Sequence, residues 1–352
     1  MRRIISLLLT LIIIVTCSSC GFKKAENKPY SITFQCFDTI CSITIYDEKP
    51  KKDLEKIANK LEKKCIHYDS LYNLDDSRYS VEFHHNDGSI TCIEDVHFSN
   101  KKNAMRTIGF GEEDEPLYNS IKYSKMTDGA FDVTIAPLVK LWNINGKDFK
   151  IPSDKQIKKQ LKYVDYKQID DSPGNYYVLT KMGSIDFGGI AKGFISDLLV
   201  TELKENKIKS ALIDLGGNIY TYGKKNNSLF KVGIKKPFTN NELSATVKAK
   251  DKAIITAGIY QRYHKKDGKI YSHIINPKTG YPIDNDLNAV TVISDSGTAA
   301  DALSTGFMVM GLKKGIALAN KTKNIEAVFI DKDNNLHLTD GLKQDGKEIT
   351  IK

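Results

Sequence analysis

The chain has 352 residues, enough for one large domain or two of ordinary size. Hydrophobic residues make up 41% and charged residues 27% of the sequence, a balance typical of folded proteins, which excludes an intrinsically disordered chain. The formal net charge of +9 comes from 52 basic residues interspersed with 43 acidic ones. Because no basic stripe stands out, we expect no nucleic-acid partner.

The N-terminus has the features of an export signal. Arg2 and Arg3 precede an apolar stretch at residues 4–15, and small residues follow it. Such a stretch is too short to cross a bilayer comfortably, whereas a basic start, a short apolar stretch and small residues are typical of a cleaved signal peptide. This segment is therefore not expected to belong to the folded body.

Cys20 and its neighbours resemble a bacterial lipobox. Ser18 and Ser19 stand directly before this cysteine, although Cys17 occupies a position where leucine is more common. A diacylated Cys20, with palmitate-type chains, would hold the protein by a lipid anchor on the extracytoplasmic face of the cell membrane. Plain secretion with cleavage nearby is the alternative. The lipobox thus predicts a signal peptide, a lipidated tether and a folded body at residues 1–19, 20–29 and 30–352.

Four cysteines remain in the body, Cys36, Cys41, Cys65 and Cys92. Outside the cell an even number permits disulfide bonds, and four cysteines allow three pairings. Free buried thiols are the alternative, and the sequence leaves both open. No CxxC pair occurs among them, so we expect no zinc cluster.

The first part of the body predicts a strand, a helix and a polar loop. Residues 30–46 alternate polar and apolar side chains, and residues 51–68 carry apolar side chains at helical spacing on a charged background. Residues 71–114 are irregular. The adjacent His84 and His85 could bind a metal, but no cysteine or carboxylate stands at a supporting spacing, so we interpret the pair as exposed loop.

The motif TDGAFDVTIAPLVKLW predicts a turn, a short strand at residues 130–135 and a helix. Pro137 suits the first turn of that helix, which carries the only tryptophan of the chain, Trp142. A lone tryptophan is most often a core anchor, and we favour that role over ligand stacking. Another helix is predicted at residues 154–161, with Ser153 as its N-cap.

Two glycine pairs follow, each after an acidic residue. Residues 185–194, IDFGGIAKGF, combine Asp186 at the end of a predicted strand, paired glycines, and Lys192 near the start of a predicted helix. Backbone amides at a helix start and a lysine can form a phosphate site, but the same residues can also make a plain strand-to-helix connection. Residues 210–223, SALIDLGGNIYTYG, repeat the pattern between two predicted strands.

Arg262 lies between two tyrosines in the strand-rich part that follows. It could steer a phosphate or carboxylate, or make a surface ion pair, and the sequence favours neither. A helix is predicted near the C-terminus at residues 312–320, followed by a strand hairpin that turns at residues 333–335. The strands expected before this region are at residues 230–234, 245–249 and 253–256.

Residues 271–306 hold the densest set of chemically capable side chains. His273 lies beside apolar neighbours, a Pro/Gly turn follows, and residues 289–294 predict a strand. If the chain is helical from residue 299, Asp301 and Thr305 are spaced i and i+4 and share one face. A carboxylate and a hydroxyl in this arrangement suit a hard cation. Helix capping is the plainer alternative for such residues.

The chain resembles the ApbE family of FAD:protein FMN transferases over roughly residues 30–340. The resemblance is carried by five motifs in the same order, TDGAFDVTIAPLVKLW, IDFGGIAKGF, ALIDLGGNIY, YSHIINPKTGYP and TAADALSTG. It implies a mixed α/β (α+β) fold, one large catalytic domain at residues 30–352 with mostly antiparallel strands and flanking helices. It also implies an Mg²⁺-dependent enzyme that moves FMN from its substrate FAD to a Ser or Thr hydroxyl of a target protein, releasing AMP. The expected target is a flavoprotein subunit of a membrane electron-transfer complex.

The resemblance further implies three groups of site residues. His273 is expected to take the proton from the attacking hydroxyl, and a histidine with an ordinary pKa would suit that role. A core histidine satisfied by backbone is the alternative for this residue. The residues expected near FAD are Phe37, Ala130, Phe131, Asp132, Asp186, Lys192 and Ile275. The expected Mg²⁺ ligands are Gly189, through its backbone oxygen, Asp301 and Thr305.

Three positions depart from the family pattern. Ala257 and Ile259 stand where serine and aspartate are common, and Gly306 stands where alanine is frequent. The first two changes remove polar groups near the expected site, which could alter substrate choice, whereas no expected metal ligand or base is missing. Two other functions remain open, an FAD hydrolase that releases FMN and AMP, and a flavin-binding lipoprotein without chemistry.

Overall fold

The computed structural model describes residues 28–72, 81–84, 90–93, 107–108, 115–170, 177–179 and 184–352. The predicted signal peptide, Cys20 and most of the tether lie outside the described residues. His85 does so as well, and of His84 only its place at the end of a strand is described. Within the described ranges, no helix combines the length and the apolar character that crossing a membrane requires.

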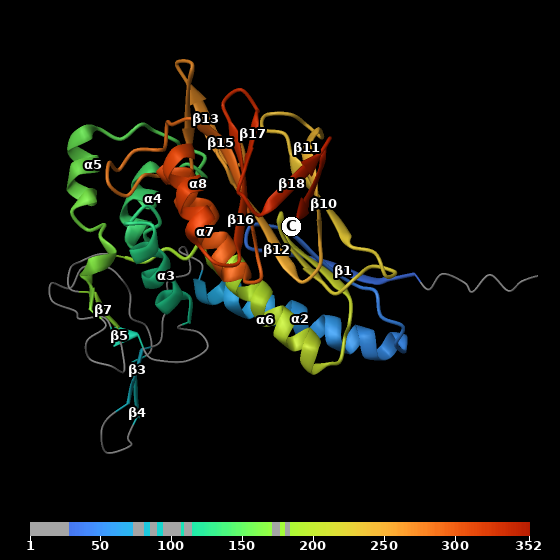
Figure 1. The fold of residues 1–352 in the computed structure, drawn as a ribbon. Coiled ribbons are helices and arrows are strands. Elements are labelled where there is room, and N and C mark those ends of the chain that lie inside the picture. Colours follow the sequence, from blue (N-terminus) through green and yellow to red (C-terminus); the bar gives the residue numbers. More distant parts are fainter. Residues whose placement is uncertain are drawn as a thin grey trace, which may run out of the picture.

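A large antiparallel sheet forms the centre of the molecule (Figure 1). Its strands lie in the order β1, β2, β8, β9, β12, β15, β16 and β17, and each neighbouring pair is antiparallel. Strand β15 is buried at every position because both faces of the sheet are covered there. The bounds are Tyr30–Cys36 (β1), Thr39–Ile45 (β2), Ala211–Leu215 (β8), Asn218–Tyr222 (β9), Lys252–Gly258 (β12), Leu287–Ser294 (β15), Ile325–Asp331 (β16) and Leu336–Leu338 (β17).

A second sheet packs on one face of the main sheet. It has the order β10, β11, β19, β18, and its β11–β19 pair is parallel. Buried side chains from both sheets, such as Val247 on β11 and Ile293 on β15, form one apolar core between them. The bounds are Phe230–Lys235 (β10), Leu243–Ala249 (β11), Leu342–Asp345 (β18) and Glu348–Ile351 (β19).

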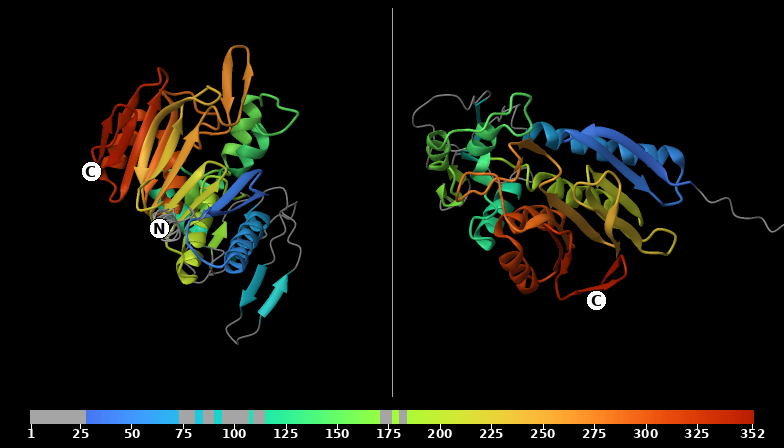
Figure 2. Two further views of the ribbon diagram at one scale, coloured as in Figure 1. Left: turned by 90° about the vertical axis from the view of Figure 1, so that its right-hand side faces the viewer. Right: turned by 90° about the horizontal axis from the view of Figure 1, so that it is seen from above.

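Three small sheets in the described part of the chain lie outside these layers. Two are hairpins, β13–β14 and β3–β4, and the third has the order β5, β7, β6. The β13–β14 hairpin projects from the body (Figure 2). The bounds are Val81–His84 (β3), Ile90–Ile93 (β4), Thr107–Ile108 (β5), Ile169–Asp170 (β6), Tyr177–Leu179 (β7), Tyr263–Lys266 (β13) and Lys269–Ser272 (β14).

Helices α2, α6 and α7 cover the other face of the main sheet, and α8 packs against α7 and β16 (Figures 1 and 2). Their apolar side chains and the main sheet form the largest core. The bounds are Lys51–Tyr72 (α2), Glu115–Met126 (α3), Ala136–Trp142 (α4), Asp154–Leu161 (α5), Ala191–Glu205 (α6), Gly297–Met310 (α7) and Leu312–Lys321 (α8), with 3₁₀ helices at Val133–Ile135 (η2) and Tyr166–Gln168 (η3). The expected mixed α/β class with mostly antiparallel strands is confirmed.

Trp142 anchors a smaller core beside the main layers. It is fully buried, and its Nε1 donates a hydrogen bond to the backbone oxygen of Gly280 at 2.7 Å. Apolar side chains from α4 and α5 pack with it. The predicted role of a core anchor is confirmed, as are Pro137 in the first turn of α4 and Ser153 as the N-cap of α5.

The structure differs from the predicted elements in several places. Residues 30–46 form two strands instead of one, because Phe37 and Asp38 adopt left-handed conformations, φ 54° and 53°, and turn the chain. Ile185 and Asp186 are not in a strand. Strands β18 and β19 were not expected, since each is only four residues long and β18 is mostly exposed and polar, which leaves little apolar pattern.

The described cysteine side chains are free thiols. Cys36, Cys41 and Cys65 are buried in the main core and form no disulfide. Burial raises the pKa of Cys41 to about 11 and raises the pKa values of the other two thiols as well, so all three stay protonated at neutral pH. The free alternative is therefore the one observed for these three, and the side chain of Cys92 lies outside the described residues.

Candidate functional site

The site is built where α6 and α7 cross in contact. A β-carbon at Gly193 would lie 2.1 Å from the backbone oxygen of Gly297 and 2.6 Å from Cβ of Asp301, so only glycine permits this approach. The amide of Gly193 donates a hydrogen bond to Oδ2 of Asp301 at 2.9 Å. Asp301 is only 6% exposed. The crossing thus fixes a buried carboxylate against the first turn of α6.

Asp197, one turn further along α6, holds the start of α7. Its Oδ1 accepts a hydrogen bond from the amide of Gly297 at 2.6 Å. Its Oδ2 accepts from the amide and the hydroxyl of Thr298 at 3.0 and 2.7 Å, and from Oγ of Ser296 at 2.9 Å. Burial raises the pKa of Asp197, while these four donors lower it. A carboxylate at a helix N-terminus is favourably placed, and here it belongs to the neighbouring helix.

Thr305 lies one turn after Asp301 on α7, as the i and i+4 spacing predicts. A β-carbon at Gly189 would lie 3.4 Å from Oγ1 of Thr305 and 3.1 Å from the ring of Phe131. Gly189 precedes α6, so the turn before α6 and the middle of α7 are neighbours. The structure therefore brings Gly189 to Asp301 and Thr305, although the glycine lies more than a hundred residues before them in the sequence.

The donors at this place are oxygens suited to a hard cation. Burial raises the pKa of Asp301, whereas Lys192, the Gly193 amide and Asn218 lower it. The side-chain amide nitrogen of Asn218 is buried and has no hydrogen-bond partner of usual geometry among the described residues. No group of three or more His, Cys, Asp or Glu side chains in the described part of the chain could hold a metal. A cation here would thus rely on one carboxylate, a hydroxyl and a backbone oxygen. Its positive charge would stabilise a carboxylate that is buried away from water.

His273 follows β14, and its backbone nitrogen and its ring nitrogen Nδ1 both face the same backbone carbonyl. The backbone amide donates to the oxygen of Arg262 at 3.0 Å, and Nδ1 lies 3.2 Å from the same oxygen. Because a carbonyl only accepts, we assign the ring proton to Nδ1, which leaves the lone pair on Nε2. A neutral ring held this way can accept a proton at Nε2.

The pKa of His273 is lowered to about 4, chiefly by burial. The hydrogen bond to the Arg262 carbonyl raises this pKa, and the positive charges of Arg262 and Lys192 lower it. The expectation of an ordinary histidine pKa is therefore wrong. The same lysine also lowers the pKa values of Asp186 and Asp301, so it lies among these three groups. At neutral pH the site holds a neutral imidazole, a lysine and two aspartates.

Asp132 ties the motif of residues 130–135 into a turn. Its Oδ1 accepts hydrogen bonds from the amide and hydroxyl of Thr134 at 2.9 and 2.6 Å, and its Oδ2 accepts from the amide of Tyr166 at 2.9 Å. This capping produces the 3₁₀ helix η2, so the strand predicted at residues 130–135 is wrong. The carboxylate is occupied by protein donors, and Ala130 and Phe131 are buried beside it.

Asp186 joins this turn to the start of α6. Its amide donates to the oxygen of Val133 at 2.8 Å, and its Oδ1 accepts from the amide of Gly188 at 2.7 Å. The glycine pair thus lies in a turn that the side chain of Asp186 closes. Because the ring of Phe131 also contacts Gly189, the predicted residues of both motifs line one region.

Phe37 and Ile275 lie at the edges of the region. Phe37 forms the β1–β2 turn, where its amide donates to Oδ2 of Asp69 at 3.0 Å. Burial raises the pKa of the Cys41 thiol on β2, and the charge of Lys192 lowers it, so β2 lies within electrostatic reach of Lys192. Ile275 is buried in the Trp142 core two residues after His273.

Sequence reasoning missed Asp197 and Gly193 as parts of the site. Both stand in the helix AKGFISDLL, where an aspartate interrupts an apolar face. An acidic residue at such a position needs buried donors, and this signal could have identified Asp197. Arg262 contributes its backbone oxygen, and its side chain is exposed and makes no ion pair with another described residue.

Comparison with known proteins gives consistent matches. The sequence profile of the ApbE family matches residues 37–329. An FAD:protein FMN transferase of Klebsiella pneumoniae is 32% identical over 231 residues, covering 64% of this chain and 72% of the relative. One of Treponema pallidum is 28% identical over 345 residues, covering 92% and 90% of the two chains. The crystal structure of the ApbE protein from Thermotoga maritima superposes with a TM-score of 0.74 at 24% identity, covering 89% of this chain and 97% of that one, and shares the fold.

Proposed function

The chain belongs to the ApbE family and is a flavin transferase of the kind named FAD:protein FMN transferase, and we propose that it moves FMN from FAD to a Ser or Thr hydroxyl of a target flavoprotein. In this proposal the reaction depends on Mg²⁺ and releases AMP. The observation that supports it best is the meeting of a buried carboxylate, a hydroxyl and a lysine near a neutral imidazole.

Gly189, Asp301 and Thr305 are the proposed ligands of Mg²⁺. Support comes from the desolvated Asp301 carboxylate and from Oγ1 of Thr305, which makes no hydrogen bond within the described part of the chain. Bound Mg²⁺ would supply positive charge beside the FAD pyrophosphate and so favour departure of AMP. The Gly193 amide keeps Asp301 in one orientation, which lowers the cost of ordering a ligand.

His273 is the proposed general base. Nε2 would take the proton of the acceptor hydroxyl while the oxygen of that hydroxyl forms a bond to the phosphorus of the FMN moiety. The bond from that phosphorus to the AMP oxygen breaks, and AMP leaves with the electron pair. The carbonyl of Arg262 keeps the ring in the tautomer that this step needs, and Lys192 adds positive potential where charge develops.

The residues near the flavin and the cellular location are part of the same proposal. Phe131, Asp186 and Lys192 would contact FAD, while Asp132, whose carboxylate is already hydrogen-bonded, would shape the pocket through the turn that it closes. Ala130, Phe37 and Ile275 would complete the pocket. Lipidation at Cys20 would keep the enzyme on the extracytoplasmic face of the membrane, where flavoprotein subunits of electron-transfer complexes would be its targets.

Product analysis tests the proposal against hydrolysis and plain binding. Residues 28–352 are incubated with FAD and Mg²⁺, with and without a candidate acceptor domain, and FMN, AMP and bound FAD are separated by chromatography. We expect AMP release that requires the acceptor and is lost in His273→Ala, with FAD affinity kept. Equal amounts of free FMN and AMP with or without acceptor would indicate a hydrolase. Intact FAD that stays bound would indicate a carrier.

A further inference from the structure

The motif ALIDLGGNIY forms the hairpin of β8 and β9. Gly216 and Gly217 make its turn with φ of 66° and 94°, conformations that glycine adopts without strain. Oδ1 of Asp214 accepts a hydrogen bond from the amide of Gly217 at 2.7 Å. A β-carbon at Gly216 would lie 2.2 Å from Cγ2 of Thr39, so the turn packs directly against the start of β2. These contacts also fix the position of Asn218, the first residue of β9.

The side-chain amide of Asn218 is a buried donor beside the Asp301 carboxylate. Asn218 is 6% exposed, and its Nδ2 has no hydrogen-bond partner of usual geometry among the described residues. Burial raises the pKa of Asp301, and a hydrogen bond from the Asn218 side chain is one of the interactions that lower it. Together these observations place Nδ2 close to the carboxylate, but without the alignment of a full hydrogen bond.

A second donor from another part of the fold would complete the support of this carboxylate. The amide of Gly193, on α6, already donates to Oδ2 of Asp301 at 2.9 Å. Asn218 belongs to the main sheet, so the two donors reach Asp301, on α7, from different elements. One donor leaves a carboxylate free to turn about that bond, whereas two donors from separate elements also fix its orientation.

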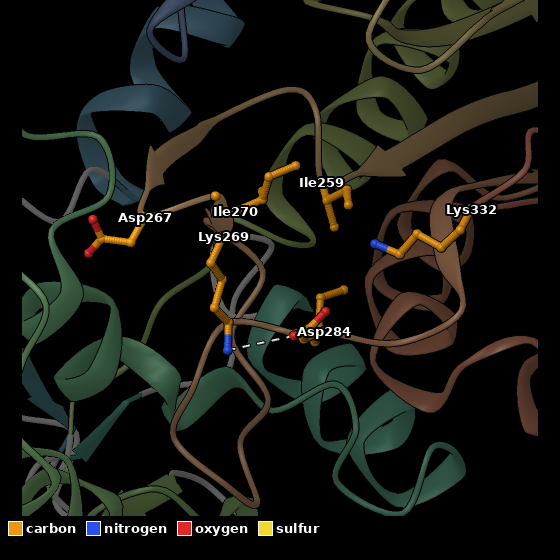
Figure 3. Close-up of a pocket in the computed structure, with 8 residues that line it drawn as sticks. Ile259, Asp267, Lys269, Ile270, Asp284 and Lys332 are labelled. Carbon is orange, nitrogen blue, oxygen red and sulfur yellow. Dashed lines mark ion pairs between the residues drawn. The ribbon is translucent and has the colours of Figure 1, made fainter.

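The hollow beside the β13–β14 hairpin, with a volume of about 520 Å³, contains no comparable donor (Figure 3). Its charged side chains are two lysines and two aspartates, and Lys269 pairs with Asp284 across 3.6 Å. None of the described residues that line it has a buried side-chain nitrogen or oxygen without a partner. The buried donor of Asn218 therefore directs attention to the crossing of α6 and α7 and not to this hollow.

We propose that Asn218 is a positioning residue for the metal site, whose side-chain amide completes its hydrogen bond to Asp301 when the cation binds and so holds the carboxylate in its ligating orientation. The proposal rests on the proposed function, in which Asp301 is a ligand of Mg²⁺. Because this donor makes no full hydrogen bond in the described structure, Asn218 should contribute to cation affinity and little to the stability of the metal-free fold.

Urea unfolding in EDTA tests the second half of this expectation. Asn218→Ala is compared with the wild type and with Asn288→Ala, which removes the same atoms from another buried position. Asn288 is 4% exposed on β15, but its Nδ2 donates to the oxygen of Asp331 at 2.9 Å. We expect Asn288→Ala to lower the urea midpoint clearly more than Asn218→Ala, because only Asn288 loses a hydrogen bond that is already made. Equal losses would contradict the proposal.

Mg²⁺ affinity tests the first half. The Tm of each protein is measured over a series of Mg²⁺ concentrations at fixed FAD and without an acceptor domain. We expect the half-maximal Mg²⁺ concentration to rise at least about tenfold in Asn218→Ala and to keep its wild-type value in Asn288→Ala. FAD turnover by Asn218→Ala should approach the wild-type kcat at saturating Mg²⁺, because the proposed ligands are all retained. An unchanged half-maximal concentration in Asn218→Ala, or an equal rise in Asn288→Ala, would overturn the proposal.

The same titration separates the role of Asn218 from the proposed function. A wild type and an Asn218→Ala variant whose Tm values rise identically with Mg²⁺ would contradict the positioning role alone and leave the metal site intact. A wild type whose Tm does not respond to Mg²⁺ would contradict the metal site itself and would overturn both.

Discussion

Replacing Gly193 with alanine should separate the two helices that carry the site. The new β-carbon would lie 2.1 Å from the oxygen of Gly297, whereas real β-carbons stay about 3.0 Å or more from other atoms, so α6 and α7 must move apart by about 0.9 Å. The hydrogen bond from Gly193 to Asp301 would then lengthen from 2.9 Å to beyond about 3.5 Å and be lost. A backbone carbonyl cannot rotate away as a side chain can.

The expected loss of stability is about 3 kcal/mol. Overpacking costs about 1–3 kcal/mol, and a lost hydrogen bond to a buried carboxylate costs about 1.5–3 kcal/mol, while alanine in a helix returns about 1 kcal/mol. Gly346→Ala serves as the control, because a β-carbon at Gly346 would meet no atom within 4 Å. Its left-handed φ of 56° should cost only about 1 kcal/mol.

Urea unfolding of residues 28–352 measures both values, and FAD turnover is measured in parallel. We expect Gly193→Ala to lose about 3 kcal/mol and to turn over FAD at least tenfold more slowly, because Asp301 is displaced. Gly346→Ala should keep full turnover. If Gly193→Ala lost less than about 1 kcal/mol and kept full turnover, the glycine contact would not be what positions Asp301.

Three other predictions concern titratable groups. Because burial lowers the pKa of His273 to about 4, kcat/KM for FAD should stay level from neutral pH down to about pH 5 and fall below it, and a fall centred near pH 6.5 in a pH–rate profile would disprove this. Burial raises the folded-state pKa of Asp301, so the folded protein is more stable while Asp301 is protonated. This stability is lost as pH rises through the titration range of Asp301. Asp301→Asn should therefore raise the Tm of the metal-free protein at pH 8. It should also abolish the Tm increase caused by Mg²⁺ and cut turnover at least about 100-fold. A Tm increase by Mg²⁺ that persists in this variant would exclude Asp301 as a ligand. Asp197→Ala removes the acceptor of the Gly297 and Thr298 amides and should cost about 3 kcal/mol in urea unfolding, against under about 1 kcal/mol for the exposed Asp295→Asn. Equal costs would contradict the capping role.

Local patterns predicted much of the fold. The apolar spacing of α2, the Ser153 cap of α5 and the i and i+4 pair on α7 all follow from side chains that are close in sequence. The strand expected at residues 130–135 failed because the side chain of Asp132 captures nearby backbone amides, and apolar alternation alone cannot weigh that competition.

The site depends on contacts that sequence spacing does not reveal. Gly193 touches Gly297 and Asp301, about a hundred residues away, and only the crossing of α6 and α7 joins them. The resemblance to a known family predicts roles for Asp301 and His273, but neither the cap by Asp197 nor the low pKa of His273 follows from motifs. Both arise from burial, which needs the packed structure.

Intact mass analysis of an acceptor domain tests the central claim most directly. The domain is incubated with FAD, Mg²⁺ and residues 28–352, then weighed, while AMP is quantified in the same sample. The account predicts an acceptor heavier by one FMN phosphoester, formed in equal amount to AMP and absent with EDTA or with His273→Ala. An unmodified acceptor alongside released AMP and FMN, or an adduct formed equally well in EDTA, would contradict it.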